Sequence, residues 1–89
     1  MRAIVSVIGK DKKGIIANVA MQLFKSDINI LDISQTIMQN EYFTMVMMVE
    51  LPDKVTIQEI NISLEKLASD LGVEIRIQHE DIFNSMHRM

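Results

Sequence analysis

The order in which apolar side chains change their spacing is the feature that most constrains the fold of this chain. In four stretches apolar residues recur at every second position, which is the pattern of a strand with a buried face. In two other stretches they recur every three or four positions, which is typical of an amphipathic helix. The strands are expected at 2–8, 27–38, 43–51 and 73–79, and the helices from Ile15 onward and over 57–71.

This order of elements predicts a ferredoxin-like βαββαβ sandwich of the α+β class. Right-handed crossovers place the strands at 2–8 and 43–51 in the centre of a four-stranded antiparallel sheet, with the two helices on one face. The other two strands are then the edges of the sheet. We expect one domain over residues 1–80, followed by a C-terminal tail or short helix over 81–89.

The two helices carry different signals. In the first helix, apolar residues at helical spacing predict the buried stripe, which is Ile16, Val19, Ala20, Leu23 and Phe24. The second helix has marked ends, because Thr56 and Glu59 form a capping box and Gly72 suits the left-handed residue that stops a helix. The boundaries of the second helix are therefore the better defined.

The strand at 27–38 is predicted to be half-buried. Its apolar residues Leu31, Ile33 and Ile37 share one face, and polar residues alternate with them. The residues at 39–42 read as a turn into the next strand, so the two strands are expected to form a hairpin.

The small size of the chain favours self-association. A chain of 89 residues buries only about two thirds of the surface of its unfolded state. Several apolar residues also lie off the predicted buried faces, namely Met21, Val46, Met48 and Ile62. We therefore expect a homodimer or a higher even oligomer, paired either through the strand at 27–38 or through the open face of the sheet.

Composition excludes several classes of protein. The net charge of −3 argues against a nucleic-acid binder, which normally needs a concentrated basic face. The chain has no cysteine, which excludes a disulfide scaffold and thiolate metal sites. No stretch reaches the ~20 apolar residues of a membrane span, and the N-terminus does not read as a signal peptide. A soluble cytoplasmic protein without a membrane partner is expected.

The loop after the first strand resembles half of a phosphate-binding loop. Gly9 and Gly14 have the spacing of the two glycines in a P-loop, but Ile15 and Ile16 occupy the places of its lysine and hydroxyl residue. The side chains that contact the phosphates and magnesium are therefore missing. The dinucleotide fingerprint also fails, because Asp11 stands where a glycine is needed. No cofactor is expected.

Other activities known for this fold also lack their residues. Copper chaperones need loop cysteines, and RNA-recognition domains need aromatic side chains on the central strands. Acylphosphatase-like enzymes bind phosphate through an arginine after the first strand, where this chain has lysines, so such an enzyme is the least favoured reading. No nucleophile and base, or pair of carboxylates, stands in a recognisable arrangement, and His79 and His87 lack a third ligand. Neither catalytic residues nor a metal site are expected.

The loop, the second strand and the element order together resemble the ACT domain, a small regulatory module of amino-acid metabolism. The residues that carry the resemblance are the loop from Asp11 to Ile16 and the segment from Asp27 to Ile30. The resemblance extends over about residues 2–79 and is closest to free-standing single-domain members and the glycine-cleavage regulator type. It implies that two chains pair by their second strands, with a ligand between the first loop of one chain and the asparagine segment of the other.

This resemblance identifies the candidate ligand-binding residues as Asp11, Gly14, Ile15, Asn29 and Ile30. Chemistry supports these residue types, because free N–H groups at a helix start attract a carboxylate and an asparagine side chain both donates and accepts hydrogen bonds. An amino acid is therefore the expected ligand, and a regulated protein is a possible further partner. The alternatives are that Asp11 only caps the helix, that Gly14 serves only packing and that Asn29 only ends a turn. The whole chain could also be a protein-interaction subunit that binds no ligand.

Overall fold

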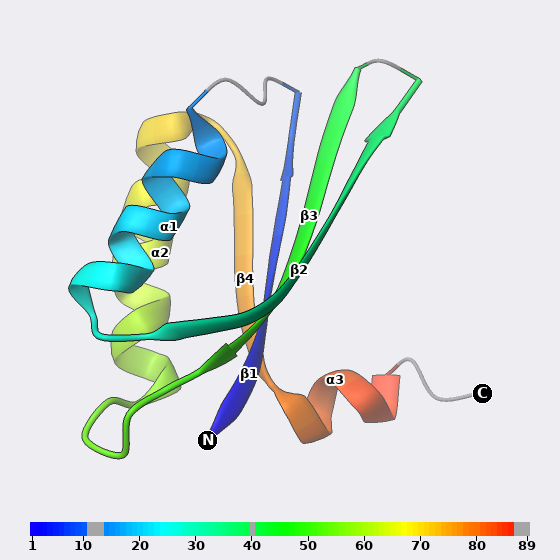
Figure 1. Cartoon of the computed structure of the whole chain (residues 1–89). Helices are drawn as coiled ribbons and strands as arrows, with labels where there is room; N and C mark the ends of the chain where they lie inside the picture. The colour runs from blue at the N-terminus through cyan, green and yellow to red at the C-terminus, as the bar shows by residue number, and fades with distance from the viewer. Residues whose placement is uncertain (11–13, 40, 87–89) are drawn as a thin grey trace.

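The computed structural model describes residues 1–10, 14–39 and 41–86. Within these ranges, three helices and four strands follow one another (Figure 1). In chain order they are β1 (Arg2–Gly9), α1 (Ile15–Lys25), β2 (Asn29–Met38), β3 (Tyr42–Glu50), α2 (Ile57–Leu71), β4 (Glu74–His79) and α3 (Glu80–Met86).

The strands form one antiparallel sheet in the order β2-β3-β1-β4. Helices α1 and α2 lie side by side on one face of this sheet, and the short helix α3 lies on the opposite side (Figure 1). The predicted ferredoxin-like fold, with β1 and β3 in the centre, is confirmed. The C-terminal segment begins as helix α3, which was one of the two alternatives for it.

The core lies between the sheet and α1 and α2. Alternate residues of the central strands point into it, and cross-strand partners such as Val5 and Met47 are both almost fully buried. Leu23 of α1 and Leu64 of α2 pack against this layer from the helical side. Each such side chain contributes about 1.5–3 kcal/mol through burial, so this layer supplies the main favourable energy of folding.

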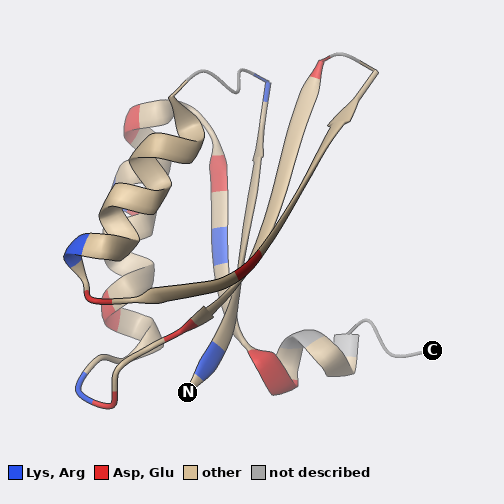
Figure 2. Ribbon diagram, viewed as in Figure 1, with Lys and Arg blue, Asp and Glu red and all other residues tan. Residues whose placement is uncertain are grey.

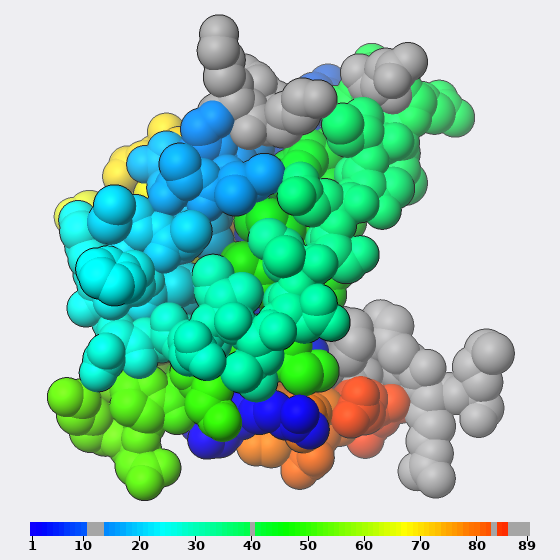
Figure 3. Space-filling view, viewed as in Figure 1, coloured from blue at the N-terminus to red at the C-terminus, as the bar shows by residue number. Residues whose placement is uncertain are grey.

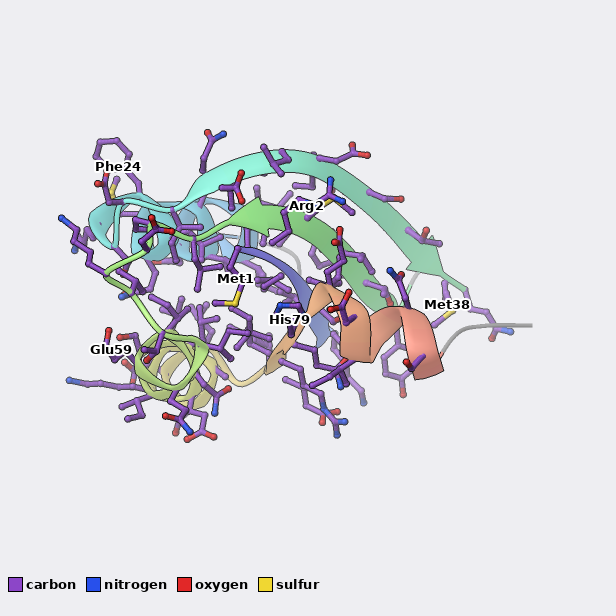
Figure 4. All side chains as sticks on the ribbon, turned by 90° about the horizontal axis from the view of Figure 1, so that it is seen from below. Met1, Arg2, Phe24, Met38, Glu59 and His79 are labelled. Carbon is purple, nitrogen blue, oxygen red and sulfur yellow. The ribbon has the colours of Figure 1, made fainter. Side chains whose placement is uncertain are left out.

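The buried stripe of α1 differs from the predicted one. Ile15, Val19 and Leu23 are buried, whereas Ile16 is 37% exposed and Phe24 is 76% exposed. Phe24 points away from the rest of the molecule (Figure 4). The α1 sequence carries apolar residues around most of the helix, so its spacing allows two adjacent stripes. Packing against the sheet and α2 buries the stripe that begins one residue earlier.

The ends of α2 agree with their sequence signals. The Thr56 hydroxyl accepts a hydrogen bond from the Glu59 N–H at 3.2 Å, and the Glu59 carboxylate accepts one from the Thr56 N–H at 3.4 Å. Gly72 follows the helix in the left-handed conformation, with φ 71° and ψ 36°. The capping box and the helix stop are therefore both confirmed.

Helix α3 covers part of the open sheet face. The Arg2 guanidinium forms an ion pair of 2.6 Å with Glu80, and His79 lies where β4 passes into α3 (Figure 4). Ile4 points away from α1 and α2, yet it is only 5% exposed, and α3 packs on β1 and β4. Val46 and Met48 on the same face are only partly buried.

Candidate functional site

Gly14 sets the backbone at the start of α1. It is the N-cap residue and has φ 77° and ψ −9°, a left-handed conformation that glycine adopts without steric cost. Its carbonyl oxygen accepts hydrogen bonds from the Asn18 backbone N–H at 3.0 Å and from the Asn18 Nδ2 at 2.7 Å. Gly14 itself offers no side-chain cap. Among the described residues, no side chain caps the N–H groups of the first turn.

Ile15 takes part in the core with its side chain. This side chain is only 2% exposed, and its Cδ1 would lie 3.5 Å from a Cβ atom built at Gly9. Only the backbone of Ile15 can therefore face a ligand. Asp11, the remaining candidate in this loop, lies outside the described residues, as do Lys12 and Lys13.

Asn29 and Ile30 lie at the far end of α1 from Gly14. They begin β2, where they pair with Glu50 and Val49 of β3. Helix α1 has 11 residues, which at about 1.5 Å per residue separates its two ends by roughly 16 Å. One chain therefore brings Gly14 and Ile15 together but does not bring Asn29 to them.

Strand β2 is exposed along its whole length. All ten of its residues are solvent-exposed, so the prediction of a half-buried strand is wrong for the single chain. The cause is its place at the edge of the sheet, where it packs mainly against β3. Ile33 and Ile37 pair with the buried Met47 and Phe43, so they share the face of the sheet that carries α1 and α2. They are nevertheless 42% and 47% exposed.

The register of β2 contains an irregularity. Ile30 pairs with Val49 and Asp32 pairs with Met48, so Leu31 is an extra residue between two consecutive pairs. This is the arrangement of a β-bulge, which bends a strand and increases its twist. From the sequence, Leu31 was predicted to lie on the same face of β2 as Ile33. The bulge at Leu31 interrupts the alternation on which that prediction depended.

On the helical side of the sheet, the edge strand β2 is left uncovered. In the space-filling view, the green surface of β3 shows between α1 and β2 (Figure 3). The ribbon of α1 carries no charge before Lys25, and Asp32 is the charged residue of β2 (Figure 2). The elements on either side of this strip of β3 therefore carry few charges.

Two features of this region were not found by sequence reasoning. Asn18 holds the carbonyl of Gly14 through both its backbone and its side chain, and an asparagine four residues after the glycine was the available signal. Lys10 lies with its Nζ 5.8 Å from the centroid of the Tyr42 ring. The order of the strands was the signal for this second contact, since it places the end of β1 beside the start of β3.

Metal coordination and a membrane span each need a recognisable feature in the described part of the chain. No group of three or more histidine, aspartate or glutamate side chains is placed there to hold a metal ion. None of the helices described is both long and apolar enough to cross a membrane.

The fold is that of a small ferredoxin-like domain with a glycine-capped helix start and an exposed edge strand. Residues 2–78 match the ACT domain, and the chain belongs to this family. A UPF0237 protein of Clostridium acetobutylicum is 54% identical over 90 residues, which cover all of both chains.

Solved structures agree with this assignment. An ACT domain protein from Streptococcus pneumoniae superposes with a TM-score of 0.84 and is 41% identical over 93% of each chain. The regulatory subunit of aspartate kinase from Thermus flavus has a TM-score of 0.66 and is 26% identical, over 88% of this chain and 51% of that one. Membership of the ACT family supports a regulatory, ligand-binding role.

Proposed function

We propose that this chain is a cytoplasmic regulatory protein that binds an amino acid or a similar small metabolite at a homodimer interface. Binding there modulates a partner protein, and the chain itself performs no catalysis. The observation that carries the proposal is the exposed edge of β2, on which Ile33 and Ile37 are left uncovered in the single chain.

The start of α1 provides the attraction for a carboxylate. The positive end of a helix dipole contributes about 0.3–1 kcal/mol for each negative charge at an exposed site. This energy alone gives only weak binding, so a useful affinity requires further contacts. In this proposal, those contacts come from a second chain that pairs with the first through β2.

Strand β2 explains how a second chain supplies them. An antiparallel β2 pair related by twofold symmetry places Asn29 of the partner subunit toward the Met38 end of β2. Strand β2 ends at the end of the molecule at which α1 begins (Figure 1). Dimerisation of this kind moves an Asn29 side chain toward Gly14, although the two residues lie far apart within one chain. It also covers Ile33 and Ile37.

A thermal-shift and calorimetric screen of the twenty amino acids tests this function. A ligand that binds only the folded state at a hundred times its Kd stabilises that state by about 2.7 kcal/mol. We expect one or a few amino acids to do so, and Asn29→Ala to remove the effect without unfolding the chain, because Asn29 is exposed.

Gly14→Ala provides the second variant, with Gly72→Ala as its matched control. Both glycines have positive φ, at 77° and 71°, so alanine strains the backbone equally at the two sites. Only Gly14→Ala is expected to weaken ligand binding. If no amino acid stabilises the wild type and a protein partner is captured equally well without ligand, the chain is instead the ligand-independent interaction subunit.

A further inference from the structure

The sequence of β2 after its bulge reads almost the same in both directions around Gln35. Ile33 and Ile37 stand at equal distances before and after it, and Ser34 and Thr36, both with hydroxyl side chains, are its neighbours. When an antiparallel strand pairs with a copy of itself about a twofold axis, residues at equal distances from the axis lie opposite one another. A near palindrome is therefore the pattern that favours self-pairing.

The structure places these matched residues on matching faces of the sheet. Ile33, Gln35 and Ile37 pair with buried residues of β3, so they lie on the face that carries α1 and α2. Ser34 and Thr36 alternate with them and lie on the opposite face. Self-pairing about Gln35 therefore sets isoleucine against isoleucine on one face and serine against threonine on the other.

The bulge in β2 selects among the possible registers. Regular pairing with β3 extends over Asp32–Met38, and Leu31 interrupts the register immediately before it. Gln35 is the middle residue of this regular stretch, so an axis at Gln35 uses the whole stretch and leaves the bulge outside. An axis at Ser34 would instead place Ile33 opposite the polar Gln35 and extend the pairing into the bulge.

The edge itself is open to pairing. All ten residues of β2 are exposed, and Asp32 is the one charged residue among them. Edge strands that remain unpaired are usually protected by charges, lysine above all, or by proline. With the axis at Gln35, Asp32 lies opposite Met38 of the partner subunit, and the two Asp32 carboxylates are roughly 20 Å apart along the strands. Charge therefore does not oppose this register.

We infer that β2 pairs with β2 of a second copy of this chain, with the twofold axis at Gln35. This register rests on the dimer of the proposed function and specifies its geometry. Ile33 contacts Ile37 of the partner subunit, and the symmetric contact covers the other two isoleucines that the single chain leaves exposed. The two four-stranded sheets become one continuous sheet. Asn29 of the partner subunit then lies beyond Met38, at the end of the molecule at which α1 begins (Figure 1).

Disulfide cross-linking of the full chain tests this register, because the chain has no cysteine of its own. Gln35→Cys places two thiols opposite each other, where the Cα atoms are about 4.5–5.5 Å apart and a disulfide can form. In Ser34→Cys and Ile33→Cys the matching Cα atoms are roughly 8 Å or more apart, which is too far. Under mild oxidation by oxidised glutathione, we expect Gln35→Cys to form a covalent dimer at least about tenfold faster than either of them.

A mixture of Ser34→Cys and Thr36→Cys chains gives a second measurement. These positions lie opposite each other in this register, so the mixed disulfide is expected to form faster than either self-disulfide. Lys66→Cys, on the exposed side of α2, measures the rate of random collision. The substituted positions of β2 are exposed in the single chain, so the fold remains, which thermal melts of the reduced variants verify.

Two results overturn the inference. The first is fastest cross-linking at Ile33→Cys or Ser34→Cys, which places the axis elsewhere. The second is a Gln35→Cys rate no greater than that of Lys66→Cys, which excludes this β2 pair.

The amino-acid screen separates this inference from the proposed function. A chain that an amino acid stabilises but that does not cross-link at Gln35→Cys refutes this register and keeps the ligand. Rapid cross-linking of a chain that no amino acid stabilises supports the register and counts against the ligand-binding function.

Discussion

The contact between Gly9 and Val73 yields a quantitative prediction about stability. A Cβ at Gly9 would lie 2.5 Å from Cγ1 and 3.2 Å from Cβ of Val73, and Gly9 itself is buried. Gly9→Ala therefore forces the start of β4 away from β1. Overpacking of this kind costs about 1–3 kcal/mol. For a domain of this size, each kcal/mol lowers Tm by roughly 4–8 °C.

A double-mutant cycle isolates the steric cause. Val73→Ala removes the two Val73 methyl groups, so it costs about 1–2 kcal/mol by lost burial but makes room for the new atom. We expect Gly9→Ala with Val73→Ala to be less destabilising than the sum of the single changes, with a coupling of about 1 kcal/mol. Urea unfolding measures all three free energies at one fixed protein concentration, since self-association alters apparent stability.

Gly72→Ala is the control for this cycle. A Cβ at Gly72 meets no atom within 4 Å, so alanine there adds only backbone strain of about 1–2 kcal/mol at φ 71°. That strain is expected to be additive with Val73→Ala. If Gly9→Ala also proves additive with Val73→Ala, the close approach of β4 to β1 is not what requires a glycine at position 9, and the reasoning fails.

Three other substitutions test the helix cap, the core and the edge strand. Thr56→Ala is expected to cost about 1 kcal/mol in urea unfolding, because α2 loses its capping hydroxyl, whereas Thr56→Ser retains it. Leu64→Ala is expected to cost about 2–5 kcal/mol, and Ile62→Ala to be nearly neutral, because Leu64 is fully buried and Ile62 is 69% exposed. Ile33→Lys is expected to shift light scattering toward the monomer while leaving the chain folded, since Ile33 is 42% exposed in the single chain. Asp32→Asn is the control on the opposite face, and a dimer unaffected by Ile33→Lys would exclude pairing through β2.

The parts of the fold that local chemistry determines were predictable from the sequence. Thr56 and Glu59 satisfy backbone groups within one turn, and Gly72 adopts a conformation that few other residues tolerate, so the ends of α2 follow from adjacent residues. The strand order followed from the spacing of apolar residues and the handedness of crossovers.

Burial was less predictable, because it depends on what other elements cover. The apolar residues of α1 allowed two stripes, and only packing distinguished Ile15 from Ile16. Strand β2 has the alternation of a half-buried strand, but neither α1 nor α2 extends over Ile33 and Ile37 in the single chain. This discrepancy is itself informative, since a sequence pattern suited to burial favours a covering partner.

The candidate site was predictable only in part. Gly14 was identified from a local pattern, and its positive φ explains the glycine. Ile15 was correctly placed at the helix start, but its side chain belongs to the core. Under the proposed function, the relation between Gly14 and Asn29 depends on assembly, which no periodicity within one chain encodes.

The two edges of the sheet differ in a way that limits growth. A sheet with two unpaired, accessible edges can add further chains at both edges and grow into an open-ended assembly. On β4, Glu74 and Arg76 are charged and exposed, which makes this edge a poor template for another strand. On β2, the extra residue Leu31 interrupts regular pairing near its start, so a partner strand can match it in few registers. In the proposed dimer, pairing through β2 would leave neither chain with an exposed apolar edge, so assembly would stop at a closed pair.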